Sequence, residues 1–291
     1  MSSIKTVAVV GAGTMGAGIA QTVALAGMTA RLHDSDARAL SSGLARALAL
    51  IDGGLERGKI TAQEGDKARA ALCALPDLEE AVSGADLVIE AVPERMDLKR
   101  ETFERLSRLC PASAILASNT SSLSVTEIAS SVPAPSRVVG LHFFNPPHLM
   151  KLVEIIRAEQ TSDETLETSR RFVAALGKEA IVVRDSPGFA TSRLGLALGL
   201  EAMRMVEQGV ASATDIDRAM VLGYGHPMGP LQVSDLVGLD VRLGIAEILQ
   251  RELGDRFQPP FILRRMVRAG KLGRKSGEGF YRWDSAGKRR D

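Results

Sequence analysis

Two ionisable residues stand in apolar surroundings within residues 141–156, LHFFNPPHLMKLVEII. His142 lies in a run with strand character, and Glu154 follows among leucine, valine and isoleucine. A carboxylate in such surroundings is costly to bury without a partner, and a nearby histidine is a natural one. A histidine paired with a carboxylate can accept a proton near neutral pH. The pair therefore suggests a general base, and the alternative is a core histidine that bonds a backbone carbonyl.

A second feature with chemical potential is the glycine-rich stretch VAVVGAGTMGAGIA near the start of the chain. It carries the pattern G-x-G-x-x-G between a run with strand character and a helix of small residues. In this context the glycines allow a tight turn, the approach of a pyrophosphate and close packing of helix on strand. The helix N-terminus then presents its N–H groups to the phosphates. The candidate cofactor loop comprises Gly11, Ala12, Gly13, Thr14, Met15 and Gly16.

Asp34 ends the second expected strand, 18 residues after Gly16. A carboxylate at this place accepts hydrogen bonds from the adenosine ribose and repels a 2′-phosphate, so NAD is favoured over NADP. The alternative is a glycine turn that binds no ligand. Beside a nicotinamide, His142 would take the proton of a hydroxyl group while hydride leaves the same carbon. Glu154 would orient the imidazole and stabilise its charged form.

The elements that must position these residues alternate between strands and helices. Strands are expected at residues 6–10, 29–33, 87–92, 114–117, 138–143, 151–157 and 180–183. Strands that alternate with helices indicate a mainly parallel sheet. Residues 36–72 interrupt this rhythm with an apolar stripe of helical period. A capping box at Thr61 and Glu64 follows the turn at Lys59, which predicts a helical hairpin.

The second part of the chain has helical patterns at residues 191–207, 214–222, 230–253 and 259–269, and no clear strand after Phe189. Thr214 and Pro230 are expected at helix starts. We place the boundary near Asp185, which gives an α/β Rossmann-type domain over residues 1–185 and an all-helical domain over residues 186–291. The apolar stripes of the helical domain exceed what one thin layer can cover, which predicts a homodimer through it.

The overall composition narrows the function classes. The chain has 291 residues, 45% hydrophobic and 24% charged, with a net charge of +1. This balance argues against broad binding to nucleic acid or to a membrane surface. Cys73 and Cys110 have no ligand-like spacing, so neither a disulfide framework nor a metal site is expected. No leader segment or membrane span is expected, and a cytoplasmic protein fits.

Longer motifs resemble those of the L-3-hydroxyacyl-CoA dehydrogenase family, in particular its bacterial 3-hydroxybutyryl-CoA branch. They are ASNTSSLSVTEIA at 117–129, GLHFFNPPHLMKLVEII at 140–156, DSPGF at 185–189 and GRKSGEGFY at 273–281. The resemblance covers essentially the whole chain and includes the hairpin. It implies reversible oxidation of a short-chain (S)-3-hydroxyacyl-CoA to the 3-oxoacyl-CoA with NAD, as in fatty acid β-oxidation, butanoate metabolism or aromatic degradation. It also implies an active site in a cleft between the domains.

The resemblance further implies a role for each matching residue. His142 matches the general base and Glu154 its partner. Ser121 matches the residue that hydrogen-bonds the reacting oxygen of the substrate, and Asn145 lies near both nicotinamide and substrate. The remaining matches are Glu94, Lys99 and Lys275, which with Ser121 and Asn145 contribute to the NAD site, and Lys59, which meets coenzyme A.

The chain departs from the family pattern at one substrate-contacting position. The family has an asparagine where PGFATSR places Ser192. A serine hydroxyl can replace only part of the hydrogen bonding of an amide. Losing one polar contact to a reacting oxygen costs on the order of 2–4 kcal/mol in the transition state.

Several alternatives stay open at the level of sequence. Ser121 could instead cap a helix that begins near Val125, and Lys59 could be a solvated turn residue. One rival function is a dehydrogenase of a hydroxy acid or sugar acid without coenzyme A, against which the hairpin argues. Another is a non-catalytic NAD-binding protein, against which His142, Glu154 and Ser121 argue.

Overall fold

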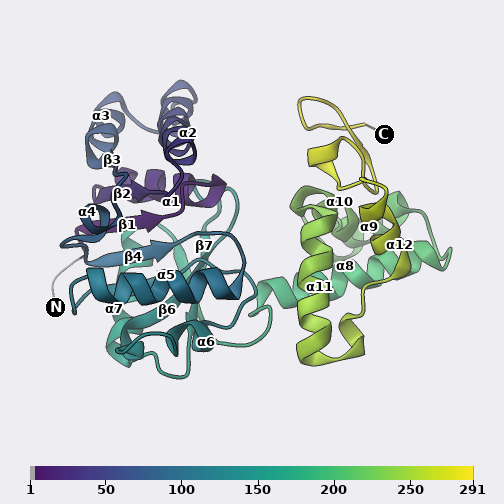
Figure 1. The fold of residues 1–291 in the computed structure, drawn as a ribbon. Coiled ribbons are helices and arrows are strands. Elements are labelled where there is room, and N and C mark those ends of the chain that lie inside the picture. Colours follow the sequence, from purple (N-terminus) through teal and green to yellow (C-terminus); the bar gives the residue numbers. More distant parts are fainter. Residues whose placement is uncertain (1–3, 291) are drawn as a thin grey trace. The chain divides into compact units, whose positions relative to one another are not determined.

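The computed structural model describes residues 4–290, and its elements are labelled in Figure 1. The chain divides into two compact units, with the division after Ser186. The first unit is an α/β unit built on one large sheet, and the second is mostly helical. No helix among residues 4–290 combines the length and the apolar character that a membrane crossing requires.

The first unit is organised around an eight-stranded sheet with the order β3-β2-β1-β4-β5-β6-β7-β8. Its strands are β1 (Thr6–Val10), β2 (Thr29–His33), β3 (Leu72–Ala74), β4 (Leu87–Glu90), β5 (Ile115–Ser118), β6 (Val138–Phe143), β7 (Leu152–Arg157) and β8 (Glu179–Arg184). All neighbouring pairs are parallel except β6 and β7, which are antiparallel. The strand order reverses between β1 and β4, as in dinucleotide-binding folds. The prediction of a mainly parallel Rossmann-type sheet is confirmed.

The central strands are apolar because both faces of the sheet are covered. Every residue of β4, β5 and β6 is buried, which explains their nearly continuous aliphatic sequence. The helices of this unit are α1 (Thr14–Leu25), α2 (Ala37–Glu56), α3 (Ala62–Ala71), α4 (Leu78–Val82), α5 (Met96–Leu109), α6 (Val125–Ala129) and α7 (Asp163–Ala175), with a 3-10 turn η1 (Pro135–Arg137). The short strand β3 and the helix α4 were not among the sequence predictions.

The helical hairpin is formed by α2 and α3. Figure 1 shows the two arms side by side, rising from the part of the sheet that contains β1–β3. The Asp36 side chain caps α2, and the turn passes through Gly58, whose φ is +62°. Thr61 and Glu64 form the predicted capping box at the start of α3. The hairpin prediction is therefore confirmed in both its elements and its turn.

The second unit consists of α8 (Thr191–Glu207), α9 (Ala213–Tyr224), α10 (Pro230–Val237), α11 (Leu239–Leu253) and α12 (Phe261–Arg268), with 3-10 turns η2 (Asp255–Phe257) and η3 (Arg274–Ser276). The single helix predicted over 230–253 is wrong, because Gly238 at φ +105° separates α10 from α11. Ser212 rather than Thr214 caps α9. A two-stranded antiparallel sheet of β9 (Arg282–Trp283) and β10 (Arg289–Arg290) was not predicted.

Asp235 in α10 anchors the last segment of the second unit. Its buried carboxylate accepts hydrogen bonds from the backbone N–H groups of Phe280 and Tyr281 and from the Trp283 indole, at 2.9–3.0 Å. A side chain at Gly279 would collide with this carboxylate, since an added Cβ would lie 2.1 Å from its oxygen. These contacts explain why the GRKSGEGFY motif has a glycine at position 279.

Candidate active site

His142 and Glu154 face each other across β6 and β7. The antiparallel register places the two residues directly opposite, and His142 Nδ1 lies 2.8 Å from Glu154 Oε2. His142 is 6% exposed and Glu154 is fully buried. Directly opposed residues on one face of such a pair have their Cβ atoms within about 5.5 Å, which is why strand register alone brings them together. The structure thus contains the buried histidine–carboxylate pair that the sequence suggested.

Asn119 supports the strand that carries His142, and sequence reasoning missed it. Its side-chain oxygen accepts a hydrogen bond of 2.9 Å from the backbone N–H of Phe143. The His142 ring also packs on Phe144, with ring centroids 4.5 Å apart. The signal for Asn119 was its place directly after β5, since β5 and β6 are adjacent parallel strands. The Asn119 hydrogen bond fixes the main chain next to His142. The contact with Phe144 fixes the orientation of the His142 ring.

The glycine loop follows β1 and opens α1, as predicted. At Gly11 the φ of +105° and an added Cβ only 2.6 Å from the Ala91 oxygen exclude a side chain. At Gly16 a Cβ would lie 1.7 Å from the Gly11 oxygen. Any side chain at this position would therefore keep α1 from packing closely on the glycine loop. Gly13 is different, because it is exposed and a Cβ there would meet nothing within 4 Å. The loop therefore presents an open backbone at the N-terminus of α1, as a pyrophosphate site requires.

Asp34 lies at the end of β2 next to this loop. One carboxylate oxygen accepts the backbone N–H of Ala12 at 2.8 Å, and the other accepts that of Asp36 at 3.0 Å. Each oxygen has further acceptor capacity. Helix α2 of the hairpin packs directly against the same loop. The approach is so close that a Cβ at Gly43 would lie 2.5 Å from the Ala12 oxygen. The carboxylate is thus fixed relative to the glycine loop by backbone hydrogen bonds.

Ser121 lies in the loop after β5 and is held by Glu94. Glu94 Oε1 accepts the Ser121 N–H at 2.9 Å and lies 3.3 Å from the Ser121 hydroxyl. The same oxygen accepts the Thr120 hydroxyl at 2.6 Å and both the N–H and the hydroxyl of Ser122. Helix α6 is capped by Ser124, not by Ser121. Ser121 therefore has no role as the cap of that helix.

Glu94 belongs to a buried ion network that also contains Lys99 and Glu90. Sequence reasoning missed Glu90. The Lys99 ammonium is 2.7 Å from Glu90 Oε1 and 3.3 Å from Glu94 Oε2. Glu90 also accepts the hydroxyl of Ser118 at 2.6 Å and the N–H of Val92 at 2.7 Å. Lys99 is 1% exposed and Glu90 is fully buried. Lys99 was expected along the NAD site. Its ammonium instead points at two carboxylates, Glu90 at the end of β4 and Glu94 in the loop that follows.

Burial acts differently on the two carboxylates of this network. Burial raises the pKa of Glu90 and outweighs the opposing Lys99 charge and the hydrogen bonds. Burial also acts to raise the pKa of Glu94, but the Lys99 charge and the hydrogen bonds from Thr120, Ser121 and Ser122 are stronger together, so the net pKa is lowered. Glu94 therefore stays ionised at neutral pH and keeps accepting hydrogen bonds from the Ser121 loop.

The other predicted site residues occupy separate places. Asn145 is exposed in the loop after β6 and precedes a cis proline, and Lys59 is exposed at the hairpin turn. In the second unit, Ser192 lies in the first turn of α8 and is partly exposed. Lys275 lies in η3, with its ammonium 2.6 Å from a carboxylate oxygen of Asp240. Among residues 4–290, no cluster of three His, Cys, Asp or Glu side chains could hold a metal ion.

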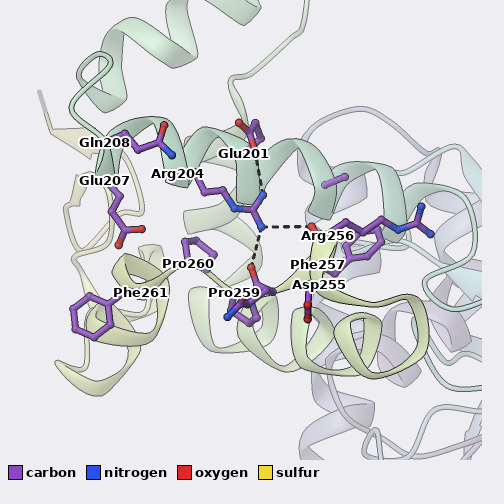
Figure 2. A pocket seen from close by; sticks show the side chains of 12 residues that line it. Glu201, Arg204, Glu207, Gln208, Asp255, Arg256, Phe257, Pro259, Pro260 and Phe261 are labelled. Atoms are coloured by element: carbon purple, nitrogen blue, oxygen red, sulfur yellow. Dashed lines mark hydrogen bonds and ion pairs between the residues drawn. The ribbon is translucent and has the colours of Figure 1, made fainter.

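A pocket in the second unit does not contain any of these residues. It has a volume of about 630 Å³ and lies between α8 and residues 255–261. Figure 2 shows Arg204 reaching across it, with hydrogen bonds to the carbonyls of Arg256 and Gln258 and an ion pair with Glu201. Glu207 accepts the N–H of Ile262 at the start of α12. Arg204 and Glu207 thus hold this segment to α8.

One edge of the sheet carries the glycine loop, Asp34, Glu94, Ser121, His142 and Asn145. These residues lie at or just after the carboxyl ends of the parallel strands β1, β2, β4, β5 and β6, where ligands of such sheets bind. A glycine loop, a carboxylate after β2 and a histidine–carboxylate pair define the class of dinucleotide-dependent dehydrogenases. The family model for the 3-hydroxyacyl-CoA dehydrogenase NAD binding domain matches residues 6–186, and that for its C-terminal domain matches residues 188–283. The chain belongs to the 3-hydroxyacyl-CoA dehydrogenase family, as the motifs indicated.

Individual relatives agree with this assignment. A probable 3-hydroxybutyryl-CoA dehydrogenase of Bacillus subtilis is 46% identical over 282 residues, which cover 97% of this chain and 98% of the relative. The crystal structure of FadB2 from M. tuberculosis has a TM-score of 0.94 at 40% identity, covering 97% of this chain and all of that one. The (S)-3-hydroxybutyryl-CoA dehydrogenase PaaH1 of Ralstonia eutropha has a TM-score of 0.92 at 39% identity, with the same coverage. The protein is an oxidoreductase with NAD as its cofactor.

Proposed function

We propose that this protein oxidises short-chain (S)-3-hydroxyacyl-CoA, with 3-hydroxybutyryl-CoA as the main substrate, to the 3-oxoacyl-CoA. The observation that carries the proposal is the buried pair of His142 and Glu154, 2.8 Å apart, at the sheet edge that also holds the glycine loop. A buried histidine with an oriented Nδ1 is suited to exchange a proton through Nε2. The relatives named as 3-hydroxybutyryl-CoA dehydrogenases support the substrate. We place the reaction in fatty acid β-oxidation in the cytoplasm.

The proposed mechanism assigns the proton to His142. NAD, when bound, supplies the acceptor for the hydride that leaves C3 of the substrate. His142 Nε2 takes the proton of the C3 hydroxyl as that carbon becomes a carbonyl carbon, and returns it in the reverse direction. Glu154 accepts the Nδ1 hydrogen, which selects the reactive tautomer and stabilises the imidazolium that forms. The two residues thus act as base and positioning partner.

Ser121 is proposed to donate a hydrogen bond to the reacting oxygen. Its hydroxyl contact to Glu94 is 3.3 Å, which is long for such a bond, whereas its backbone N–H is held firmly at 2.9 Å. The hydroxyl can therefore turn to the substrate while the backbone stays in place. Glu94 and Lys99 would act on the cofactor site through this loop. The proposal keeps the remaining contacts implied by the family motifs, with Asn145 and Lys275 near the cofactor, Lys59 near coenzyme A and Ser192 near the substrate.

Homodimerisation through the helical unit is part of the proposal. This unit exposes several large apolar side chains, although apolar residues are normally covered when they cluster. Those with the largest exposed fractions are Leu194, Val210, Leu222, Tyr224 and Phe261, at 59–78%. A second copy would cover such surface in the way that obligate dimers do. Sedimentation at micromolar concentration tests this directly, and a monomer would contradict it.

One assay separates the proposal from its two rivals. We expect the purified protein to oxidise NADH when acetoacetyl-CoA is added, and to react far more slowly with free acetoacetate. A dehydrogenase of hydroxy acids without coenzyme A would use both compounds comparably. A non-catalytic NAD-binding protein would use neither. The first result supports the proposal, and either of the others overturns it.

Asp34 is expected to set the preference for NAD over NADP. The change Asp34→Asn keeps an acceptor for the Ala12 N–H but removes the charge that strengthens bonds to the ribose and repels a 2′-phosphate. We expect kcat/KM for NAD to fall about 10- to 100-fold, with a smaller change for NADP. Asp36→Asn is a matched control, because asparagine also caps helices well. An unchanged ratio of NAD to NADP in Asp34→Asn would show that another group discriminates.

A further inference from the structure

Strand β6 extends beyond the end of its neighbour β5, and His142 lies in the part that extends. The last residue pair between these two strands is Ser118 with Gly140. On the other side, β7 pairs with β6 as far as Phe143. The main chain around His142 therefore has a strand partner on the β7 side only. A buried backbone N–H that faces the β5 side needs an acceptor from another source.

The side chain of Asn119 supplies that acceptor. Asn119 is the first residue after β5, and its Oδ1 accepts the N–H of Phe143 at 2.9 Å. Its own N–H donates to the carbonyl of Glu90 at the end of β4, at 2.8 Å. The residue is therefore anchored to β4 through its backbone and holds β6 through its side chain. The bond to Phe143 fixes the main chain at the residue directly after His142.

Asn119 also begins the loop that carries Ser121. The hydroxyl of the next residue, Thr120, donates to Glu94 at 2.6 Å. The N–H of Ser121 donates to the same carboxylate oxygen at 2.9 Å. The loop is thus a short, hydrogen-bonded path from Asn119 to Ser121, and the Asn119 side chain connects this path to β6 at Phe143.

We propose that Asn119 is a positioning residue that sets the distance between the His142 imidazole and the Ser121 hydroxyl. This inference rests on the proposed function, in which both groups meet the C3 oxygen of the substrate. The position of each group depends on the main chain of a different element. Asn119 joins the two elements two residues before Ser121 and, through Phe143, one residue after His142. An error of about 1 Å in such an arrangement can lower turnover about 100-fold.

Two variants separate the functions that the amide group of Asn119 offers. Its oxygen accepts the hydrogen bond from Phe143, whereas its NH₂ group has no hydrogen-bond partner among residues 4–290. Asn119→Asp keeps the oxygen and removes the NH₂ donors, and Asn119→Leu keeps a similar size and removes both. If the residue acts through Phe143, aspartate should replace it and leucine should not. If its NH₂ group instead contacts the substrate, both variants should fail.

Asn119→Leu is expected to lower kcat with acetoacetyl-CoA and NADH by about 10- to 100-fold. The KM for NADH should change little, because the glycine loop and Asp34 follow other strands of the sheet. Asn119→Asp should keep kcat within about threefold of wild type, since a carboxylate accepts a backbone N–H at least as well as an amide does. Steady-state kinetics on the three proteins measure these differences.

Thr161→Val is a matched control for loss of stability. The buried hydroxyl of Thr161 donates to the carbonyl of Val138, at the other end of β6, and accepts the N–H of Ala158. Valine has nearly the same shape but lacks the hydroxyl. Val138 lies four residues before His142, about 13 Å along the strand. Thr161→Val should therefore lower the melting midpoint at least as much as Asn119→Leu does, and leave kcat unchanged.

A double-mutant cycle shows whether Asn119 acts through His142. In the His142→Gln background the base is already absent, so its position no longer matters. Adding Asn119→Leu should then lower the remaining kcat by less than about twofold, because residues that act as a unit are not additive. A purely structural effect of Asn119 would instead appear in full in both backgrounds.

Four results would overturn the inference. They are an unchanged kcat in Asn119→Leu, a loss in Asn119→Asp as large as that in Asn119→Leu, full additivity with His142→Gln, and an equal loss of kcat in Thr161→Val. The second of these would assign the amide to direct contact with a ligand, and the fourth would reduce the effect to stability. A wild-type protein that does not turn over acetoacetyl-CoA with NADH would overturn the proposed function itself.

Discussion

Replacing His142 by glutamine is expected to lower kcat by about 10²- to 10⁴-fold, the usual contribution of a positioned general base. Glutamine is close to histidine in size and can still donate a hydrogen bond to Glu154, so the strand pair should remain intact. It cannot accept a proton near neutral pH. The loss should therefore fall on kcat, with little change in KM for NAD. Steady-state kinetics with acetoacetyl-CoA and NADH measure both.

A neighbouring histidine provides a matched control for this experiment. His148 lies in the loop between β6 and β7, is only partly buried, and its Nδ1 has no hydrogen-bond partner among the described residues. His148→Gln should leave kcat within about a factor of two of wild type, as expected for a position outside the site. If His142→Gln instead destabilised the fold and left kcat unchanged, His142 would be a core residue that merely satisfies Glu154.

The histidine–glutamate pair shows how far sequence reasoning reached. Two ionisable residues in aliphatic runs predicted a partnership, because neither is stable alone in such surroundings. The sequence does not contain the register, which places His142 directly opposite Glu154. That register depends on the loop of residues 144–151 and on the antiparallel direction of β7. A shift of one residue would turn Glu154 to the other face of the sheet.

The fold was predictable where local signals agreed with the long-range structure. The glycine loop, the helical hairpin and the mainly parallel sheet each had both a motif and a periodic pattern, and all three are confirmed. The break at Gly238 was missed because an isolated glycine in an apolar helical pattern is often tolerated. The strands β9 and β10 have two residues each, which is too short for any periodic signal.

Glu90 illustrates a site residue that the sequence hides. It ends a buried aliphatic strand, and nothing near it in the sequence marks a partner. Its partners Ser118 and Lys99 come from the adjacent parallel strand β5 and from α5. Only the order of the strands and the docking of α5 bring these groups together. The family motif pointed to Glu94 and Lys99. It did not reveal that Glu90 forms a second ion pair with Lys99.

The change Lys99→Met is expected to destabilise the first unit by about 3–5 kcal/mol, the cost of leaving a buried charge unpaired. Methionine fills nearly the same volume, so the loss arises from the charge and not from a cavity. Glu90 would remain fully buried with only Ser118 and Val92 as hydrogen-bond donors. The free energy of unfolding in urea, followed by circular dichroism, measures the effect at pH 7.5.

The double variant Glu90→Gln/Lys99→Met distinguishes this explanation from simple loss of packing. Removing both charges should recover most of the stability, because well-packed neutral groups can replace a buried ion pair at little cost. Catalysis should not recover to the same degree, since Glu94 would still lack the Lys99 contact that holds it beside Ser121. A double variant that is as unstable as Lys99→Met would show that volume, not charge, is decisive.

The stability loss in Lys99→Met should also depend on pH in a defined direction. Burial raises the pKa of Glu90 already in the wild type, and removal of the Lys99 charge raises it further. A carboxyl whose pKa is higher in the folded than in the unfolded state contributes stability that is fully present below its unfolded value, near 4.5, and is lost as the pH rises through the folded value. The difference between wild type and Lys99→Met should therefore shrink from pH 7.5 to pH 5. A difference that is equal at both pH values would mean that Glu90 is not the group left unpaired.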